Sequence, residues 1–252
     1  YPYYDKTTHS INIDAMMETL NRVPAGDVVL LHGCCHNPTG ADLQPEHWDQ
    51  IADIALEREF IPFIDIAYQG LGQGLDADAY GLRMMAERLP ELLVASSCSK
   101  NFGLYRERTG SITLVAESAE QAKIVSAQSM SIARQIYSMP PAHGALLVSL
   151  ILGDDQLRAN WQAELEEVRL RIKSMRTLLT DGINNNAAGL DFSHIKQQQG
   201  MFSFLGITSD QLNRLREEFA IYIVGSTRVN LAGINSNNIE YLTQSIKTVL
   251  DS

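Results

Sequence analysis

The sequence predicts an α/β fold: a mostly parallel sheet with helices on both faces, followed by a smaller C-terminal α+β unit. Over residues 1–116, apolar strand-like runs alternate with segments of helical spacing. Strands separated by helices are typical of crossover units in parallel sheets. After residue 116 the spacing becomes that of long amphipathic helices, and short strand-like runs return near the C-terminus. We expect a first domain over residues 1–175 and a second over residues 176–252.

The individual elements follow from local patterns along the chain. We expect strands at 27–35, 61–70, 91–97 and 110–116 in the first unit, and at 200–207 and 221–233 in the second. We expect helices at 45–60, 79–89, 118–138, 145–153, 155–179, 209–219 and 238–249. Pro140 and Pro141 separate two of these helices, because proline lacks a backbone donor and clashes with the preceding turn.

Composition narrows the class of partner. Thirty acidic and twenty basic residues give a net charge of −10, which argues against nucleic acid and against an anionic membrane surface. The longest apolar run, residues 145–153, is too short to cross a bilayer. Three cysteines do not make a disulfide framework, and the first residues do not read as a signal peptide. We therefore expect a cytoplasmic protein that acts on a small molecule.

Polar side chains follow each of the first three predicted strands. The segments are "HGCCHNPTG" at 32–40, "DIAYQG" at 65–70 and "SSCSK" at 96–100. Ligands of open parallel sheets bind outside the carboxyl ends of the strands, so we expect these segments to meet at one place. The candidate site residues that they supply are His32, His36, Asn37, Asp65, Tyr68, Ser97 and Lys100.

Asp65 places the tightest constraint on the chemistry. A carboxylate between apolar residues of a buried strand costs several kcal/mol unless a cation meets it. That cation is either Lys100 or the protonated ring nitrogen of a cofactor, which leaves Lys100 free to form an imine. Pyridoxal phosphate chemistry requires a lysine, an acidic partner for the ring nitrogen and groups that bind a phosphate. Taken locally, Lys100 is also typical of a surface charge after a strand, and residues 37–40 are typical of a simple turn.

Five segments, in chain order, resemble a known family. They are "HGCCHNPTGADL", "DIAYQGLGQGL", "SSCSKNFGLYRERTG", "ARQIYSMPPAHG" and "STRVNLAG". They are similar to the aspartate and aromatic amino acid aminotransferases, pyridoxal-phosphate enzymes of fold type I. The resemblance implies a partial large domain that binds pyridoxal 5′-phosphate, and a small C-terminal domain. It also implies transfer of an amino group between aspartate or an aromatic amino acid and 2-oxoglutarate.

The resemblance implies a role for each residue that surrounds the cofactor ring. Lys100 binds the cofactor covalently and later moves a proton between the substrate and the cofactor. Asp65 keeps the ring nitrogen protonated. Asn37 and Tyr68 hydrogen-bond to the phenolic oxygen of the ring, which lowers the pKa of the imine, and Asn37 also contacts the substrate.

The resemblance implies further roles for residues that bind anionic groups. Ser97 and Arg108 bind the phosphate, because a planar guanidinium pairs with two oxygens. Arg228 binds the α-carboxylate of the substrate in the same way. Arg134 reaches from a neighbouring subunit to the side-chain carboxylate of dicarboxylic substrates, which implies a homodimer with shared active sites.

Other polar residues are expected to have no part in the chemistry. Arg106 is interpreted as a solvated loop residue, while His32 and His36 are interpreted as packing residues. No metal-ligand spacing is present, so we expect no metal. Cys34 and Cys35 are expected to be small buried residues.

Two hypotheses about activity remain open. The chain does not begin with methionine, and it lacks segments that correspond to roughly the first third of the family, so we expect a fragment. Either the parent protein is an active aminotransferase, or the chain is a catalytically incompetent piece that at most binds the cofactor. The preference between aromatic and dicarboxylic substrates stays open as well.

Overall fold

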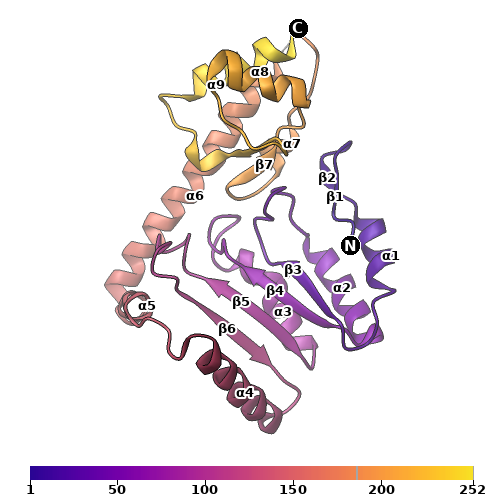
Figure 1. The fold of residues 1–252 in the computed structure, drawn as a ribbon, viewed down its shortest axis with the longest axis vertical. Helices are drawn as coiled ribbons and strands as arrows, with labels where there is room; N and C mark the ends of the chain where they lie inside the picture. Colours follow the sequence, from indigo (N-terminus) through magenta and orange to yellow (C-terminus); the bar gives the residue numbers. More distant parts are fainter. Residues whose placement is uncertain (186, 252) are drawn as a thin grey trace.

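A four-stranded sheet lies at the centre of the larger part of the molecule in the computed structural model, which describes residues 1–185 and 187–251 (Figure 1). Its strands lie side by side in the order β3 (Val28–His32), β4 (Ile61–Ile66), β5 (Leu92–Ser97) and β6 (Gly110–Val115). The first three are parallel, and β6 pairs antiparallel with β5. The predicted α/β class with a mostly parallel sheet is therefore confirmed.

One face of this sheet is covered by two helices, α2 (Pro45–Arg58) and α3 (Tyr80–Arg88) (Figure 1). Side chains alternate along a strand, so Leu31, Ile64 and Leu92 point into the covered face and are 0% exposed. Val28 and Leu30 point to the other face and are 52% and 48% exposed. Among the described residues, the second face of the sheet is therefore much more open than the first.

A helix of 30 residues, α6 (Asp155–Asn184), connects the sheet to the C-terminal unit (Figure 1). It follows α4 (Ala119–Tyr137) and α5 (His143–Gly153). Near its start, the Trp161 ring stacks on Phe102 with 4.4 Å between centroids. Near its end, Leu179 and Ile183 are fully buried, and this half contacts α7 and α9. The predicted boundary between residues 175 and 176 falls inside this continuous helix and stays a prediction.

The C-terminal unit packs helices on a short antiparallel pair of strands. Its elements are α7 (His194–Gln197), β7 (Phe202–Phe204), α8 (Ser209–Phe219), β8 (Arg228–Asn230), the 3-10 turn η2 (Leu231–Gly233) and α9 (Ile239–Leu250). The N-terminal pair β1 (Tyr4–Asp5) and β2 (Ser10–Ile11) leads to α1 (Ile13–Leu20), which lies beside α2. Gln198 connects the C-terminal unit to the N-terminal residues. Its side-chain amide donates to the Tyr4 hydroxyl at 3.3 Å and to the His9 carbonyl at 3.3 Å.

Several predicted strands are longer than the observed ones. The run 221–233 is a strand only from Arg228 to Asn230, because Thr227 has a φ of 66° and donates its N–H to Val224 in a turn. The run 27–35 ends at His32, and Cys35 already has a φ of 51°. An extended strand excludes such left-handed residues, so local apolarity alone overstates the length of both strands.

Arg176 is a buried charge that organises the start of the C-terminal unit. It lies on α6 and is 2% exposed. Its guanidinium donates to the carbonyls of Ile195, Gln199, Gly200 and Phe202, and to the hydroxyl of Ser203, at 2.6–3.2 Å. Burial lowers the pKa of Arg176 to about 10, which leaves the group charged at neutral pH. This one side chain therefore fixes the loop that leads into β7.

No helix in the described part of the chain is both long and apolar enough to cross a membrane.

Candidate active site

Three predicted segments meet where β3, β4 and β5 end. Asp65 lies opposite His32 on β3 and opposite Ala95 on β5. Asn37 lies in the loop after β3, Tyr68 follows β4, and Lys100 follows β5. The carboxyl ends of parallel strands meet at one edge of a sheet, and the structure brings these side chains together at that edge.

A line of hydrogen bonds connects this edge to the C-terminal unit. The Asn37 side-chain amide donates to the Tyr68 hydroxyl at 3.2 Å, and its oxygen accepts from Nη1 of Arg228 at 3.2 Å. Arg228 is 191 residues away from Asn37 in the chain. Burial raises the pKa of Tyr68, although the bond from Asn37 lowers it, so the phenol is a proton donor at neutral pH. Asn37 thus links the two units within the site.

Lys100 lies directly beside this line of residues. Its Nζ is 4.8 Å from the centroid of the Tyr68 ring, a distance at which a cation is attracted to the face of the ring. Within residues 1–185 and 187–251 it makes no ion pair with Asp65. The sequence allowed either Lys100 or the ring nitrogen of a cofactor as the cation that pairs with Asp65. In this structure Lys100 is not that partner.

Asp65 keeps its carboxylate half-buried and without a cationic partner. No hydrogen bond or ion pair of this side chain is found in the part of the chain that the structure describes. His32, its neighbour on β3, has its pKa lowered by burial and raised by the Asp65 charge, with burial dominant. A neutral imidazole does not balance the carboxylate, so the site can accept a cationic group beside Asp65.

Phe202 belongs to the site but was not predicted from the sequence. The Arg228 guanidinium lies 4.6 Å from the centroid of the Phe202 ring, and this ring meets Tyr68 at 90° with 6.3 Å between centroids. The available signal was the "FSF" run of β7, in which Phe202 and Phe204 lie on one face and Ser203 lies on the other. The register pairs Phe204 with Arg228 and Phe202 with Asn230, so it does not by itself select Phe202. Only the tertiary structure shows that the Arg228 guanidinium packs on the Phe202 ring.

The two predicted phosphate-binding residues lie on the connection between β5 and β6. Ser97 is the last residue of β5, and its hydroxyl accepts from the Ser99 N–H at 3.2 Å. Arg108 is exposed, has a φ of 52° and donates to the Tyr105 carbonyl at 2.9 Å. The Cys98 N–H donates to the Thr109 carbonyl at 3.0 Å, which holds the two ends of the connection together.

Two other arginines lie apart from these contacts. Arg106 is exposed on the same connection, as expected of a solvated residue. Arg134 is exposed on α4, a helix without buried residues, and its side chain has no hydrogen bond or ion pair among the residues that the structure describes. The structure therefore does not bring Arg134 to the residues around Lys100 within one chain.

His32, the last residue of β3, and His36, in the loop that follows, pack as expected. The His36 ring stacks on Tyr3 with 4.0 Å between centroids and lies 4.4 Å from His32. Burial, aided by the proximity of His32, lowers the pKa of His36 to about 3. A ring that stays neutral at physiological pH, held between two other rings, supports the loop that carries Asn37.

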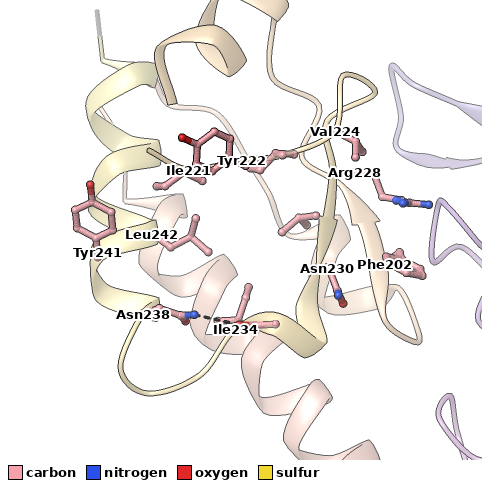
Figure 2. A pocket seen from close by; sticks show the side chains of 13 residues that line it. Phe202, Ile221, Tyr222, Val224, Arg228, Asn230, Ile234, Asn238, Tyr241 and Leu242 are labelled. Carbon is pink, nitrogen blue, oxygen red and sulfur yellow. Dashed lines mark hydrogen bonds between the residues drawn. The ribbon is translucent and has the colours of Figure 1, made fainter. Parts of the chain in front are cut away.

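A cavity of about 570 Å³ lies in the C-terminal unit, and Arg228 stands at its edge. Its walls are mainly apolar and include Ile221, Ile234 and Leu242 (Figure 2). Figure 2 shows the guanidinium of Arg228 pointing away from this cavity, toward the loops of the larger unit. The hydrogen bond to Asn37 agrees with that direction, so the polar chemistry lies outside the cavity.

Comparison with known proteins identifies the family. Residues 1–246 match the family model of aminotransferase class I and II. The chain is 52% identical to an aspartate aminotransferase of Haemophilus influenzae and 46% identical to an aromatic-amino-acid aminotransferase of Pseudomonas aeruginosa. Both matches cover 99% of this chain, but the chain spans only 63% and 62% of these relatives.

Solved structures agree with this match. The aromatic-amino-acid aminotransferase of Burkholderia pseudomallei, covalently bound to pyridoxal phosphate, superimposes with a TM-score of 0.97 at 43% identity. That match covers 99% of this chain and 63% of the other. The Psychrobacter sp. B6 aromatic amino acid aminotransferase, cocrystallised with aspartic acid, also has a TM-score of 0.97 at 43% identity, covering 100% of this chain and 63% of the other. With its family model matched over nearly its full length, the chain belongs to the class I and II aminotransferases.

Proposed function

We propose that the chain carries the chemistry of a pyridoxal-phosphate-dependent aminotransferase that acts on aspartate or on aromatic amino acids. The observation that carries this proposal is the contact line from Lys100 through Tyr68 and Asn37 to Arg228. It places an amine, a phenol, an amide and a guanidinium around one edge of the sheet. This set suits a substrate that is itself an amino acid, with one carboxylate to bind and one amino group to transfer.

The donor set fits pyridoxal 5′-phosphate. Lys100 would hold it covalently, and Asp65 would pair with its protonated ring nitrogen, the cation that the carboxylate lacks within this chain. Asn37 and Tyr68 would hydrogen-bond to its phenolic oxygen. Ser97 and Arg108 would bind its phosphate. When bound, this cofactor supplies an electron-poor ring that accepts the electron pair released at the substrate Cα.

Each residue then has a distinct task. As a free amine, Nζ of Lys100 would take the proton from the substrate Cα as a general base and give it back as a general acid to complete the amino-group transfer. Asp65 would lie beside the protonated ring nitrogen as its counter-charge. Arg228 binds the α-carboxylate through its two parallel N–H groups, and the Phe202 ring behind the guanidinium limits its orientation.

The amino-group acceptor and the assembly are further parts of the proposal, and they rest on the resemblance of the sequence motifs to the family. We propose 2-oxoglutarate as the amino-group acceptor and a homodimer in which Arg134 of one subunit serves the site of the other. The exposed position of Arg134 on α4 is compatible with such a role. The chain's net charge of −10 supports small substrates over nucleic acid or an anionic membrane as partners.

Transamination by the chain itself tests the proposal. The chain, incubated with pyridoxal 5′-phosphate, should acquire a visible absorbance band that bleaches when glutamate is added, and it should convert aspartate or phenylalanine with 2-oxoglutarate. A second candidate is cofactor binding without turnover. The open sheet face at Val28 and Leu30 favours it, because such surface is usually covered in a complete domain. A stable band that glutamate does not bleach supports this second candidate, and the absence of any band contradicts both.

Replacement of Arg228 and replacement of Arg134 should change kcat/KM in different ways. Arg228→Ala should lower kcat/KM for aspartate and phenylalanine alike, because both have an α-carboxylate. The loss of a charge-assisted bidentate pair costs about 2–5 kcal/mol. Arg134→Ala should penalise aspartate and leave phenylalanine nearly unchanged, and steady-state kinetics on both substrates measure this difference. Equal losses for the two substrates in the Arg134 variant would show that its proposed role is wrong.

A further inference from the structure

Two adjacent cysteines lie at the turn after β3, and neither has a task in the proposed chemistry. Cys34 and Cys35 are 6% and 2% exposed, and Asp78, which belongs to the 3-10 turn η1 (Ala77–Ala79), is 6% exposed. The two Sγ atoms and a carboxylate oxygen of Asp78 all lie within 4.8 Å of one another. Three potential ligands from two segments of the chain therefore converge in the interior.

The Asp78 carboxylate is fixed in place by the backbone. Its Oδ2 accepts from the N–H groups of Gly70 and Gly72 at 2.8 and 3.0 Å, and its Oδ1 accepts from Gln73 at 2.7 Å. A carboxylate oxygen has two acceptor positions, so Oδ1 keeps one that is free for a further partner. Three backbone donors thus hold the carboxylate in one orientation.

Gly72 leaves open the space between this oxygen and a thiol. A Cβ at that position would lie 2.6 Å from Oδ1 of Asp78 and 3.1 Å from Sγ of Cys35. Any side chain there would press on both atoms. The backbone thus keeps the carboxylate and the thiol facing the same small volume, which is the arrangement of a preformed ligand pair.

The surroundings are accessible and negatively charged. A cavity of about 330 Å³ is lined by Cys34 and Asp78 and also by Asp42, which gives a path from solvent. The hydrogen bond to Cys34 and burial raise the pKa of Cys35 well above its usual value, and the Asp42 and Asp78 carboxylates raise it further. Two carboxyl groups and a thiol therefore line one cavity, and these are groups that bind cations.

We propose that Cys34, Cys35 and Asp78 form a binding site for a thiophilic divalent cation, Zn²⁺ or Cd²⁺. Thiolates select such soft ions, and two sulfurs with one carboxylate leave one tetrahedral position open, here toward the cavity. Ligand atoms around tetrahedral zinc lie about 3.5–3.8 Å apart, within the 4.8 Å that the three atoms span. Binding forms two metal–sulfur bonds and one metal–oxygen bond, and the two thiol protons leave to solvent.

A bound ion would act on the loop that carries Asn37. Cys35 precedes Asn37 by two residues, and the Cys35 N–H and the His36 N–H both donate to Asp42 at 2.7 Å. The ion would join this loop to the 70–78 segment through Asp78. The site is distinct from the residues assigned to the cofactor, so its test does not depend on transamination.

Titration of the whole chain with Cd²⁺, in oxygen-free buffer with a phosphine reductant, tests the proposal. We expect an ultraviolet sulfur-to-metal charge-transfer band that saturates at about one ion per chain, with release of about two protons. At pH values below the pKa of the thiols, the Kd for Cd²⁺ should fall by about 100-fold for each unit by which the pH is raised, because binding displaces two protons. Zn²⁺ should compete for the same site and remove the band.

Cysteine variants locate the site. Cys34→Ser and Cys35→Ser should each lose the band, whereas Cys98→Ser, which alters the other free cysteine, should keep it. Circular dichroism should be used to check that each variant is folded. The number of protons that the unmodified chain releases on binding Cd²⁺ is a second test, and it needs no variant. Three results would each overturn the site: no band, a band that survives in both Cys34→Ser and Cys35→Ser, or release of fewer than two protons per ion.

Discussion

Replacement of Lys100 with alanine should abolish covalent attachment of pyridoxal 5′-phosphate and transamination together. Nζ of Lys100 lies over the Tyr68 ring, beside the line that ends at Arg228. No other lysine lies in the segments that form this edge of the sheet. Loss of the proton transfer alone should reduce kcat by about 10²–10⁴-fold. The measurements are the stoichiometry of cofactor trapped by borohydride and the steady-state rate with aspartate.

Two control variants separate chemistry from charge. Lys100→Arg keeps a cation over the Tyr68 ring but cannot form the covalent bond, so it should also trap no cofactor. Lys123→Ala removes an exposed lysine on α4 and should trap the cofactor at full stoichiometry. Full trapping in Lys100→Ala would reject the assignment, and loss of trapping in Lys123→Ala would show that the assay does not report on this site.

Replacement of Arg176 with methionine should produce the largest loss of stability. The substitution roughly keeps the volume but leaves the carbonyls of Ile195, Gln199, Gly200 and Phe202 without their donor. Hydrogen bonds to a charged group contribute about 1.5–3 kcal/mol each, and an unsatisfied buried group costs a similar amount. We expect the free energy of unfolding to fall by at least about 3 kcal/mol, measured by urea denaturation.

Arg171 supplies a matched control for Arg176 on the same helix. It is exposed, and it donates to the carbonyls of Ala232 and Ile234 at 2.7 and 2.8 Å. Water can partly replace the guanidinium of an exposed arginine as a donor, so Arg171→Met should cost less than about 1.5 kcal/mol. Equal losses in the two variants would mean that burial of Arg176 does not determine its contribution.

Arg176 also connects stability to the site. It binds the carbonyl of Phe202, whose ring lies against the Arg228 guanidinium. A folded Arg176→Lys variant would keep the charge but lack the planar fork that reaches several carbonyls. We expect it to bind the substrate carboxylate more weakly, with a rise in KM for aspartate and phenylalanine alike.

Sequence patterns were sufficient to place a site residue wherever its position depends only on the strand that contains or precedes it. Asp65 lies in an alternating apolar run, so its place within β4 follows from local periodicity. Lys100 follows the run of β5, and Asn37 follows that of β3. The rule that ligands bind at the carboxyl ends of parallel strands then places these residues together. The bounds of the elements were less accurate. The strands were predicted too long, because turn residues with positive φ interrupt apolar runs, and the helix predicted over 155–179 continues to Asn184.

The roles assigned to individual residues came from the resemblance rather than from these patterns. Ser97, Arg108 and Arg134 lie in segments whose local sequence is equally typical of solvated loops and helices. The structure gives Ser97 and Arg108 a shared connection, and it leaves Arg134 exposed on α4. Their contacts with phosphate and substrate stay predictions, since those contacts form with groups outside the chain.

The sequence by itself determined the α/β class, the succession of strands and helices along the chain, and the identity of the polar residues at the strand ends. These features depend on side-chain periodicity and on turn residues, which act over a few neighbouring positions. The tertiary structure alone decided that Arg228 meets Asn37 across 191 residues and that the Phe202 ring packs against the Arg228 guanidinium. It also showed that Lys100 makes no ion pair with Asp65 among the residues that it describes. It also brought Asp78 to Cys34 and Cys35. Such contacts depend on how distant segments pack, because hydrogen-bond and ring geometry is set in three dimensions and has no local pattern in the chain.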